Sequence, residues 1–250
     1  MGSIGVGCTV DKRVYVEVEK SQKTEIYFNK VKINIPTVSY VIDKLTDSPA
    51  LISIKSFLPL GYGFGISGAS ALATASALNE LFNLNKTKMD LAKIAHVSEI
   101  VNHTGLGSVA TQITGGFLLK RKPGLPVLAI RLPFVGQKIY AIIIDRLLTP
   151  TVLQDKKRIR KVNTTADYYL HQLKNKKSLK LKDVTDASYN FVSETGLLTD
   201  KRVINIIDKI RKAGGSATMA ILGKVVITDM KPTFIKDYKP VELTITNDHI

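Results

Sequence analysis

The chain has 250 residues, a formal net charge of +15 at pH 7 and one cysteine, Cys8. At about 100–200 residues per domain the length allows one large domain or two small ones, and a single cysteine excludes an internal disulfide and favours a reducing compartment. No apolar run reaches the ~18–20 residues that span a bilayer, and no targeting peptide is visible, so we expect a cytoplasmic protein without a membrane partner.

The first half of the chain predicts strands and then helices. Apolar and polar residues alternate with the period of a half-buried strand over 14–18 and again over 26–35, where one slip indicates a turn or a bulge. Another strand is expected over 51–57. Residues 67–82 are rich in Ala and Leu and predict a helix. Thr87 and Asp90 have capping-box spacing and start a helix that runs to about Asn102. A short helix ending at Gly115-Gly116 and strands over 117–121 and 139–144 follow.

The pattern changes after Thr149-Pro150. Apolar residues fall mostly at helical spacing from 152 to about 213, and Gly214-Gly215 is typical of a helix stop. Apolar runs over 219–222 and 225–227 and a last strand over 241–246 complete the chain. Strands and helices mix in both halves, which predicts an α+β fold rather than a regular βαβ alternation. We place the domain boundary at residue 148, giving domains of 1–148 and 149–250.

A glycine-rich segment, P-L-G-Y-G-F-G-I-S-G-A-S-A, runs from Pro59 to Ala71, follows a predicted strand and opens a predicted helix. Glycines at every second position allow close backbone approach to a ligand, and a helix N-terminus attracts anions. The spacing is neither the Rossmann nor the Walker A pattern. The segment predicts a phosphate-binding loop; a purely structural loop before a core helix is the alternative. The residues predicted to bind the nucleotide are Pro59, Gly61, Gly63, Phe64, Gly65, Ile66, Ser67, Gly68 and Ala69.

These residues carry a resemblance to a known family. The segment resembles the second motif of the GHMP kinases, P-x-x-x-G-L-G-S-S-A-A, although Phe64 and Ile66 replace a Leu and a Ser. The stretch A-H-V-S-E over 95–99, with T-G-L-G-S-V over 104–109 and Gln112, resembles the archaeal pantoate kinase branch. Residues 214–223 resemble the third motif of that branch. The resemblance therefore extends from about residue 2 to residue 228, nearly the whole chain.

The resemblance implies a fold and an activity. The fold would be the two-domain GHMP kinase fold, with a ribosomal protein S5 domain 2-like N-terminal half and a ferredoxin-like C-terminal half. The enzyme would be a pantoate kinase that phosphorylates pantoate to 4-phosphopantoate in archaeal coenzyme A biosynthesis. It would use ATP and Mg²⁺ and work as a homodimer in the cytoplasm. Mevalonate, shikimate or another small alcohol is the rival substrate.

The resemblance also implies catalytic residues. Glu99 matches the metal-binding Glu of the family and would hold Mg²⁺ together with Ser67; the alternative for Glu99 is a solvent-facing helix charge. Ser108 stands where related kinases have an Asp that accepts or orients the substrate hydroxyl proton. Three explanations stay open: a reaction without a base, a base elsewhere, or a weak or silent homologue that binds ligands. The catalytic residues expected are Ser67, Glu99 and Ser108.

Pantoate is a carboxylate, so a cation should hold it. The candidate cations, which lie in or beside matching segments, are Arg13, His103, Lys120 and Arg121. Arg13 and Lys120 rank first among them, although either could be an ordinary surface charge. Residues 2–9 resemble the first motif of the family and would line the substrate side, with Cys8 as a small filler. The residues expected to bind the substrate are Arg13, His103, Thr104, Lys120, Gly214, Gly215 and Ser216.

The positive charge is concentrated between residues 156 and 182, where ten Lys and Arg residues accompany a single acid, Asp167. A solvated face of helices is one interpretation, and a nucleic-acid surface is the other. Binders of single-stranded nucleic acid combine basic grooves with stacking aromatics. Tyr168 and Tyr169 are the only aromatic residues in this stretch, so we expect no nucleic-acid partner.

Overall fold

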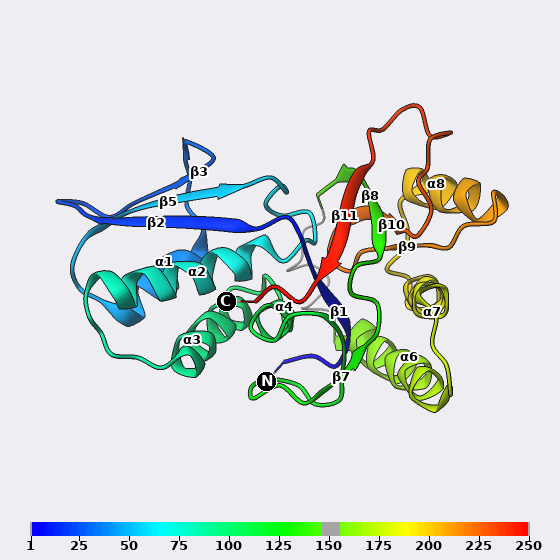
Figure 1. The fold of residues 1–250 in the computed structure, drawn as a ribbon, viewed down its shortest axis with the longest axis horizontal. Helices are drawn as coiled ribbons and strands as arrows, with labels where there is room; N and C mark the ends of the chain where they lie inside the picture. Colours follow the sequence, from blue (N-terminus) through cyan, green and yellow to red (C-terminus); the bar gives the residue numbers. More distant parts are fainter. Residues whose placement is uncertain (1, 147–155, 250) are drawn as a thin grey trace. The chain divides into compact units, whose positions relative to one another are not determined.

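The structure is a computed structural model that describes residues 2–146 and 156–249 (Figure 1). The chain forms two compact units. Unit 1 comprises Met1–Leu60, Gly65–Arg131 and Asn247–Ile250, and unit 2 comprises Gly61–Phe64 and Leu132–Thr246. The glycine-rich segment therefore contributes to both units. The domain boundary expected at residue 148 falls outside the described residues and stays a prediction.

A four-stranded sheet forms one layer of unit 1. Its strands are β2 (Val14–Lys20), β3 (Glu25–Phe28), β4 (Val31–Lys32) and β5 (Ala50–Ser56), in the order β2-β5-β3-β4. β2 is antiparallel to β5, whereas β3 is parallel to it. The slip expected within 26–35 is a turn at Asn29 and Lys30, where φ is 49° and 69°. The three strands predicted in this region are confirmed.

Three helices pack together beside this sheet, with α2 beneath β2 and β5 in Figure 1. They are α1 (Pro36–Leu45), α2 (Ile66–Leu81) and α3 (Lys88–Val101). α2 and α3 confirm the predicted helices, and the capping box at the start of α3 is present. The sequence analysis did not predict α1. The core contains apolar side chains from the sheet and all three helices, including Val38, Val41, Ile52, Ile54, Leu72, Leu78 and Leu91.

In the rest of unit 1, the N-terminal strand lies beside the strand that follows Gly115-Gly116. β1 (Gly5–Val10) pairs antiparallel with β6 (Phe117–Lys120), and β7 (Ala129–Leu132) is the other neighbour of β6. A short helix, α4 (Ser108–Gln112), precedes β6. It ends three residues before Gly115-Gly116, and both of these glycines have positive φ. The predicted short helix and the strand after it are confirmed.

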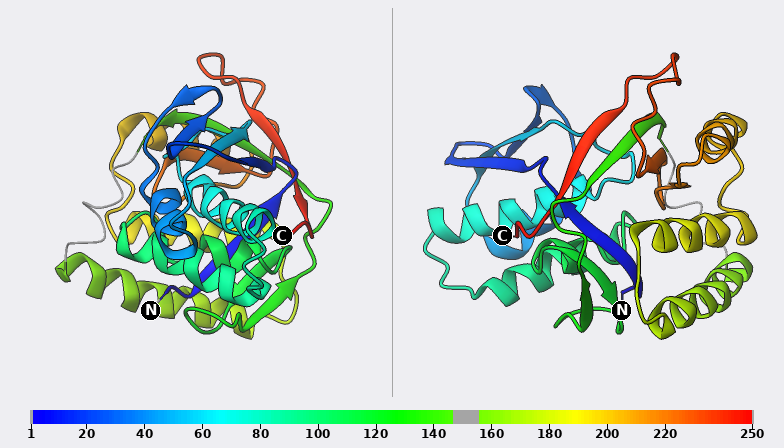
Figure 2. Two further views of the ribbon diagram at one scale, coloured as in Figure 1. Left: turned by 90° about the vertical axis from the view of Figure 1, so that its left-hand side faces the viewer. Right: turned by 45° about the vertical axis from the view of Figure 1, so that its right-hand side comes forward.

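In its described residues, unit 2 combines antiparallel strands with three helices. The strands β8 (Lys138–Asp145), β9 (Ala217–Met219), β10 (Lys224–Thr228) and β11 (Val241–Thr246) lie in the order β11-β8-β10-β9. The helices are α6 (Lys156–Asn175), α7 (Leu181–Glu194) and α8 (Lys201–Lys212). Figure 2 shows α6 and α7 side by side. The apolar face of α8 packs against the sheet through Val203, Ile206, Ile207 and Ile210. Both units mix sheets with helices, as the predicted α+β class requires.

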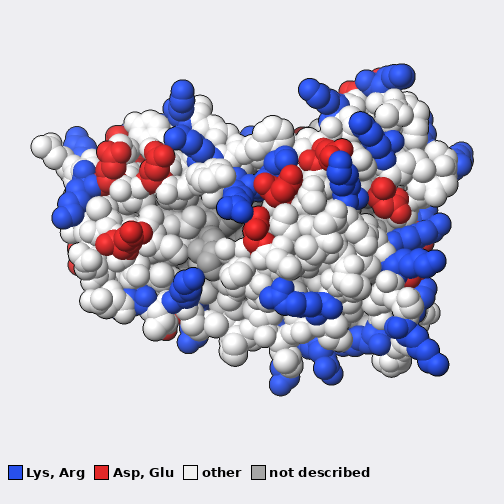
Figure 3. All heavy atoms as spheres, viewed as in Figure 1, with Lys and Arg blue, Asp and Glu red and all other residues white. Residues whose placement is uncertain are grey.

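The basic stretch identified in the sequence covers α6, the loop after it and the start of α7. Blue side chains are frequent in the space-filling view over the region of α6, α7 and α8 (Figure 3). Lys176 forms an ion pair with Asp183 at 2.7 Å. None of the helices within residues 2–146 and 156–249 is long and apolar enough to cross a bilayer.

Candidate active site

Glu99 is the central acidic group of the candidate site in unit 1. Only 1% of the residue is exposed, so the alternative of a solvent-facing charge is wrong. Its position follows from the helical period, because Leu91 and Ala95 on the same side of α3 are also buried. The Ser108 hydroxyl donates a hydrogen bond to Glu99 Oε2. Burial raises the pKa of Glu99, and hydrogen bonds from Ser108 and the Val109 backbone, together with the charge of Lys120, oppose that rise.

Two glycines make room for this carboxylate. A Cβ atom built on Gly68, in α2, would lie 2.7 Å from Ser108 Oγ and 2.8 Å from Glu99 Cδ. A Cβ atom on Gly105 would lie 2.7 Å from Glu99 Oε1. Neither position accepts a side chain without movement of its neighbours. The absence of both side chains therefore creates a cradle around the carboxylate of Glu99.

Lys120 is the buried cation near Glu99. It lies on β6 with 6% of the residue exposed, and its Nζ donates to the Gly107 carbonyl at 2.9 Å. Burial lowers the pKa of Lys120 to about 8, and the charge of Glu99 opposes that shift. A side chain on Gly107 would collide with Lys120 Nζ and with Ser3 Oγ, which comes from the first motif. The burial of Lys120 excludes the alternative of an ordinary surface charge.

The N-terminus of α2 presents backbone donors and a positioned hydroxyl. Gly65 precedes the helix with φ of 71°, and the first helical bond runs from Ala69 N–H to the Gly65 carbonyl. The N–H groups of residues 66–68 have no partner within the helix, as at other helix N-termini. Ser67 lies in this first turn, and its Oγ is 2.8 Å from Oγ1 of the buried Thr37. Gln112 Nε2 donates to the Gly65 carbonyl at 2.9 Å.

The other half of the glycine-rich segment, Gly61–Phe64, belongs to unit 2 and packs on the turn before β10. A Cβ atom on Gly63 would lie 3.0 Å from Gly223 Cα, and one on Gly223 would overlap the Tyr62 carbonyl. The first two glycines of the third motif, Gly214 and Gly215, lie in the same unit. Gly214 has φ of 90°, Gly215 follows it, and the Ser216 backbone N–H donates to Asp229 Oδ1 at 2.8 Å.

The remaining predicted residues lie apart from this cluster or at its edge. Arg13 forms an exposed ion pair with Asp248 at 2.9 Å. His103 is exposed just beyond α3 with φ of 53°. Thr104 is closer, because its backbone N–H donates to the Glu99 carbonyl at 3.0 Å. Pro59, the half-buried first residue of the glycine-rich segment, follows β5 closely in the chain. Among the predicted cations of unit 1, Lys120 is the one beside Glu99.

Two residues that contact the start of α2, Thr37 and Gln112, had no role assigned to them from the sequence. Thr37 lies in α1 and orients Ser67. Pro36 is typical of the first position of a helix, so the sequence did contain a signal for the start of α1. Gln112 was quoted only as a motif residue, and it holds the Gly65 carbonyl. Within the described ranges no three His, Cys, Asp or Glu side chains gather as a metal site. A metal at Glu99 would therefore depend on other oxygen ligands.

Comparisons with known proteins agree with this geometry. The family model for the N-terminal domain of GHMP kinases matches residues 29–116. The pantoate kinase of Methanocaldococcus jannaschii is 33% identical over 244 residues, covering 94% of this chain and 86% of that protein. The pantoate kinase of Methanospirillum hungatei is 29% identical over 230 residues, covering 89% and 76%. A solved structure described as a phosphotransferase related to the CoA biosynthesis pathway superposes with a TM-score of 0.84 at 24% identity, covering 99% of this chain and 88% of its own.

The fold, the family model and the pantoate kinase relatives together define a GHMP kinase, and the expected two-domain GHMP fold and enzyme class are confirmed. Within that class the chain belongs to the pantoate kinase family.

Proposed function

We propose that this enzyme transfers the γ-phosphoryl group of ATP to the hydroxyl group of pantoate and forms 4-phosphopantoate for coenzyme A biosynthesis, as in archaea. The observation that carries the proposal is the cluster of the buried Glu99 and Lys120 with the half-buried Ser108 behind the N-terminus of α2. Phosphoryl transfer depends mainly on positioning and on charge stabilisation. The cluster offers a carboxylate, a hydroxyl and a buried cation for those tasks.

The nucleotide would bind at the glycine-rich segment. The unpaired N–H groups at the start of α2 and the positive end of its dipole favour the phosphates of ATP. The Gly65 carbonyl accepts hydrogen bonds from the Ala69 N–H of the helix and from Gln112 Nε2, so both of these contacts hold the start of α2 in place. The Ser67 hydroxyl, oriented by Thr37, would donate to a phosphate oxygen.

Glu99 and Ser67 would also hold Mg²⁺. The residues fit this ion, because Mg²⁺ usually takes one or two carboxylates and completes its shell with water and substrate phosphates. Gly68 and Gly105 lie close to the carboxylate of Glu99, and only residues without a side chain fit there. When bound there, the ion would neutralise phosphate charge.

The acceptor substrate would lie at Lys120 and Ser108. The Lys120 ammonium would hold the carboxylate of pantoate. The Ser108 hydroxyl donates a hydrogen bond to Glu99, so Ser108 does not act as a base toward the substrate hydroxyl. Because the transition state of phosphoryl transfer is loose, the hydroxyl needs little deprotonation before attack. This account favours the base-free reaction among the three explanations for Ser108.

Ser108 also supports a second candidate, a silent homologue that binds both ligands without turnover. A steady-state assay of ADP release separates the two. With ATP and Mg²⁺, pantoate should stimulate ADP release far more than mevalonate, shikimate or homoserine. Glu99→Gln keeps the shape of the side chain and removes its charge, and it should abolish the stimulation while pantoate still binds. Nucleotide and pantoate binding without ADP release from the unaltered enzyme would favour the silent homologue.

We further propose, from the family alone, that the enzyme is a cytoplasmic homodimer. Light scattering coupled to size-exclusion chromatography would measure twice the 27.5 kDa mass of the chain; the mass of a single chain would contradict the dimer.

A further inference from the structure

An arginine in unit 2 stacks on the glycine-rich segment. Arg146 directly follows β8, and its guanidinium lies over the ring of Tyr62, 5.5 Å from the centroid. Tyr62 stands between Gly61 and Gly63, and a Cβ atom on Gly61 would lie 3.9 Å from Arg146 Cδ. Both residues belong to unit 2, so this contact lies within one compact unit.

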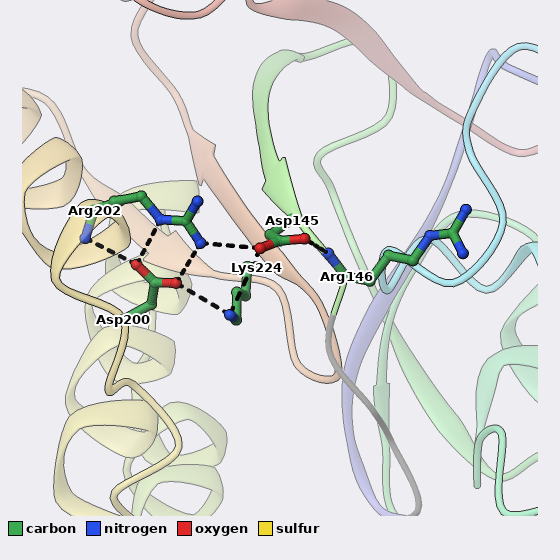
Figure 4. Close-up of polar contacts among 5 residues, drawn as sticks. All are labelled: Asp145, Arg146, Asp200, Arg202 and Lys224. Carbon is green, nitrogen blue, oxygen red and sulfur yellow. Dashed lines mark hydrogen bonds and ion pairs between the residues drawn. The ribbon is translucent and has the colours of Figure 1, made fainter.

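The charged residues around Arg146 are already paired with one another (Figure 4). Arg202 contacts Asp145 at 3.0 Å and Asp200 at 2.8 Å, and Lys224 contacts Asp200 at 3.2 Å. The two acids of this network are therefore matched by two bases. The Arg146 backbone N–H donates to Asp145 Oδ1 at 2.8 Å, whereas its side chain extends away from the network.

This arrangement leaves an exposed guanidinium with surplus positive charge beside a phosphate-binding loop. At 5.5 Å from the ring centroid the guanidinium is attracted by the ring without a hydrogen bond to it, so its N–H donors stay available for an oxyanion. The backbone of Tyr62 packs closely on Gly223, because a side chain at position 223 would overlap the Tyr62 carbonyl. A closely packed backbone at this position reduces the entropy lost when the segment binds a ligand.

We propose that Arg146 binds a phosphate group of the nucleotide and that Tyr62 is its positioning residue. The proposal rests on the proposed function, in which the glycine-rich segment holds ATP. It adds a cation from the end of β8 to the Gly61–Phe64 part of the glycine-rich segment, which belongs to the same unit. Arginine suits this role because its planar fork can donate two parallel hydrogen bonds to phosphate oxygens.

Calorimetric binding of adenosine, ADP and a non-hydrolysable ATP analogue tests the proposal. Arg146→Ala should weaken binding of ADP and the analogue by about 10- to 100-fold, the effect of losing a charge-assisted hydrogen bond. Adenosine, which has no phosphate, should bind as it does to the unaltered enzyme. Arg146→Lys should retain part of the affinity, because lysine still supplies a positive charge. Tyr62→Leu should weaken the binding of ADP and the analogue less than Arg146→Ala does.

Arg211→Ala is the matched control, because Arg211 also lies over a tyrosine, Tyr189, in unit 2, but is paired with Asp186 at 2.7 Å. It should leave all three affinities unchanged. Equal affinities in Arg146→Ala and this control would overturn the proposal, as would an equal loss for adenosine and ADP, which would mark a structural role. An unaltered enzyme that binds neither ADP nor the analogue would refute the proposed function itself.

Discussion

Replacing Gly68 by alanine tests the cradle around Glu99 with one methyl group. The added Cβ would lie 2.7 Å from Ser108 Oγ and 2.8 Å from Glu99 Cδ. Nonbonded carbon atoms prefer separations of about 3.5–4.0 Å, so the carboxyl group must retreat by about 0.7 Å or the start of α2 must move. Either movement displaces the carboxylate of Glu99 from its position between Gly68 and Gly105.

Two magnitudes follow from this displacement. A misplacement of about 1 Å costs on the order of 10²-fold in rate, so kcat should fall by about 10- to 100-fold. An alanine in an ordinary helix interior stabilises by about 1 kcal/mol relative to glycine, whereas overpacking costs about 1–3 kcal/mol. The free energy of unfolding should therefore fall by about 0–2 kcal/mol, too little to unfold the enzyme.

A coupled assay of ADP release and a urea unfolding curve measure both effects. Ala77→Gly is the control, because Ala77 is a half-buried residue of α2 outside the contacts of Glu99. It should lower stability by about 1 kcal/mol and leave kcat unchanged. A Gly68→Ala enzyme with the kcat of the parent would show that the carboxylate position does not limit turnover, and the reasoning would be wrong.

Three further predictions concern single side chains. Ser108→Asp places a second carboxylate beside Glu99, so it should lower the melting temperature of the free enzyme. In a base-free reaction it should leave kcat nearly unchanged, and a rise of roughly 10- to 10³-fold would show instead that a missing base limits turnover. Because the pKa of Lys120 is about 8, KM for pantoate should be flat below pH 8 and rise above it as the cation is lost. Lys120→Arg should remove this rise, and a persistent rise would refute the anchor. Burial raises the pKa of Cys8 to about 12, so iodoacetamide should alkylate it at pH 8 roughly 10- to 100-fold more slowly than in the unfolded chain; equal rates would contradict this.

Elements with a strong local signal were predictable from the sequence. The alternation in β2 and the capping box of α3 are local patterns, and both elements form where expected. α1 was missed even though Pro36 and the buried Val38 and Val41 have the spacing of a helix. β1 was interpreted only as a glycine motif, although Val6, Cys8 and Val10 alternate with its glycines and Thr9.

The sequence allowed the residues of the candidate site to be predicted, but not the contacts between them. The motif resemblance selected Glu99, Ser108 and Lys120, but only the fold shows that these residues meet, because they come from α3, α4 and β6. Arg13 and Lys120 were equivalent in the sequence, and tertiary packing exposes the first and buries the second. Contacts between segments far apart in the chain leave no periodic signal that a single sequence reveals.

The phosphorus spectrum of a mixture of enzyme, ATP, Mg²⁺ and pantoate tests the central claim most directly. The account predicts that the γ-phosphate signal of ATP disappears while ADP and one new phosphomonoester appear in equal amounts, only when pantoate is present. The Glu99→Gln enzyme should leave the ATP signals intact. A phosphomonoester formed from mevalonate or shikimate in preference to pantoate, or an unaltered ATP spectrum from an enzyme that binds both ligands, would contradict the account.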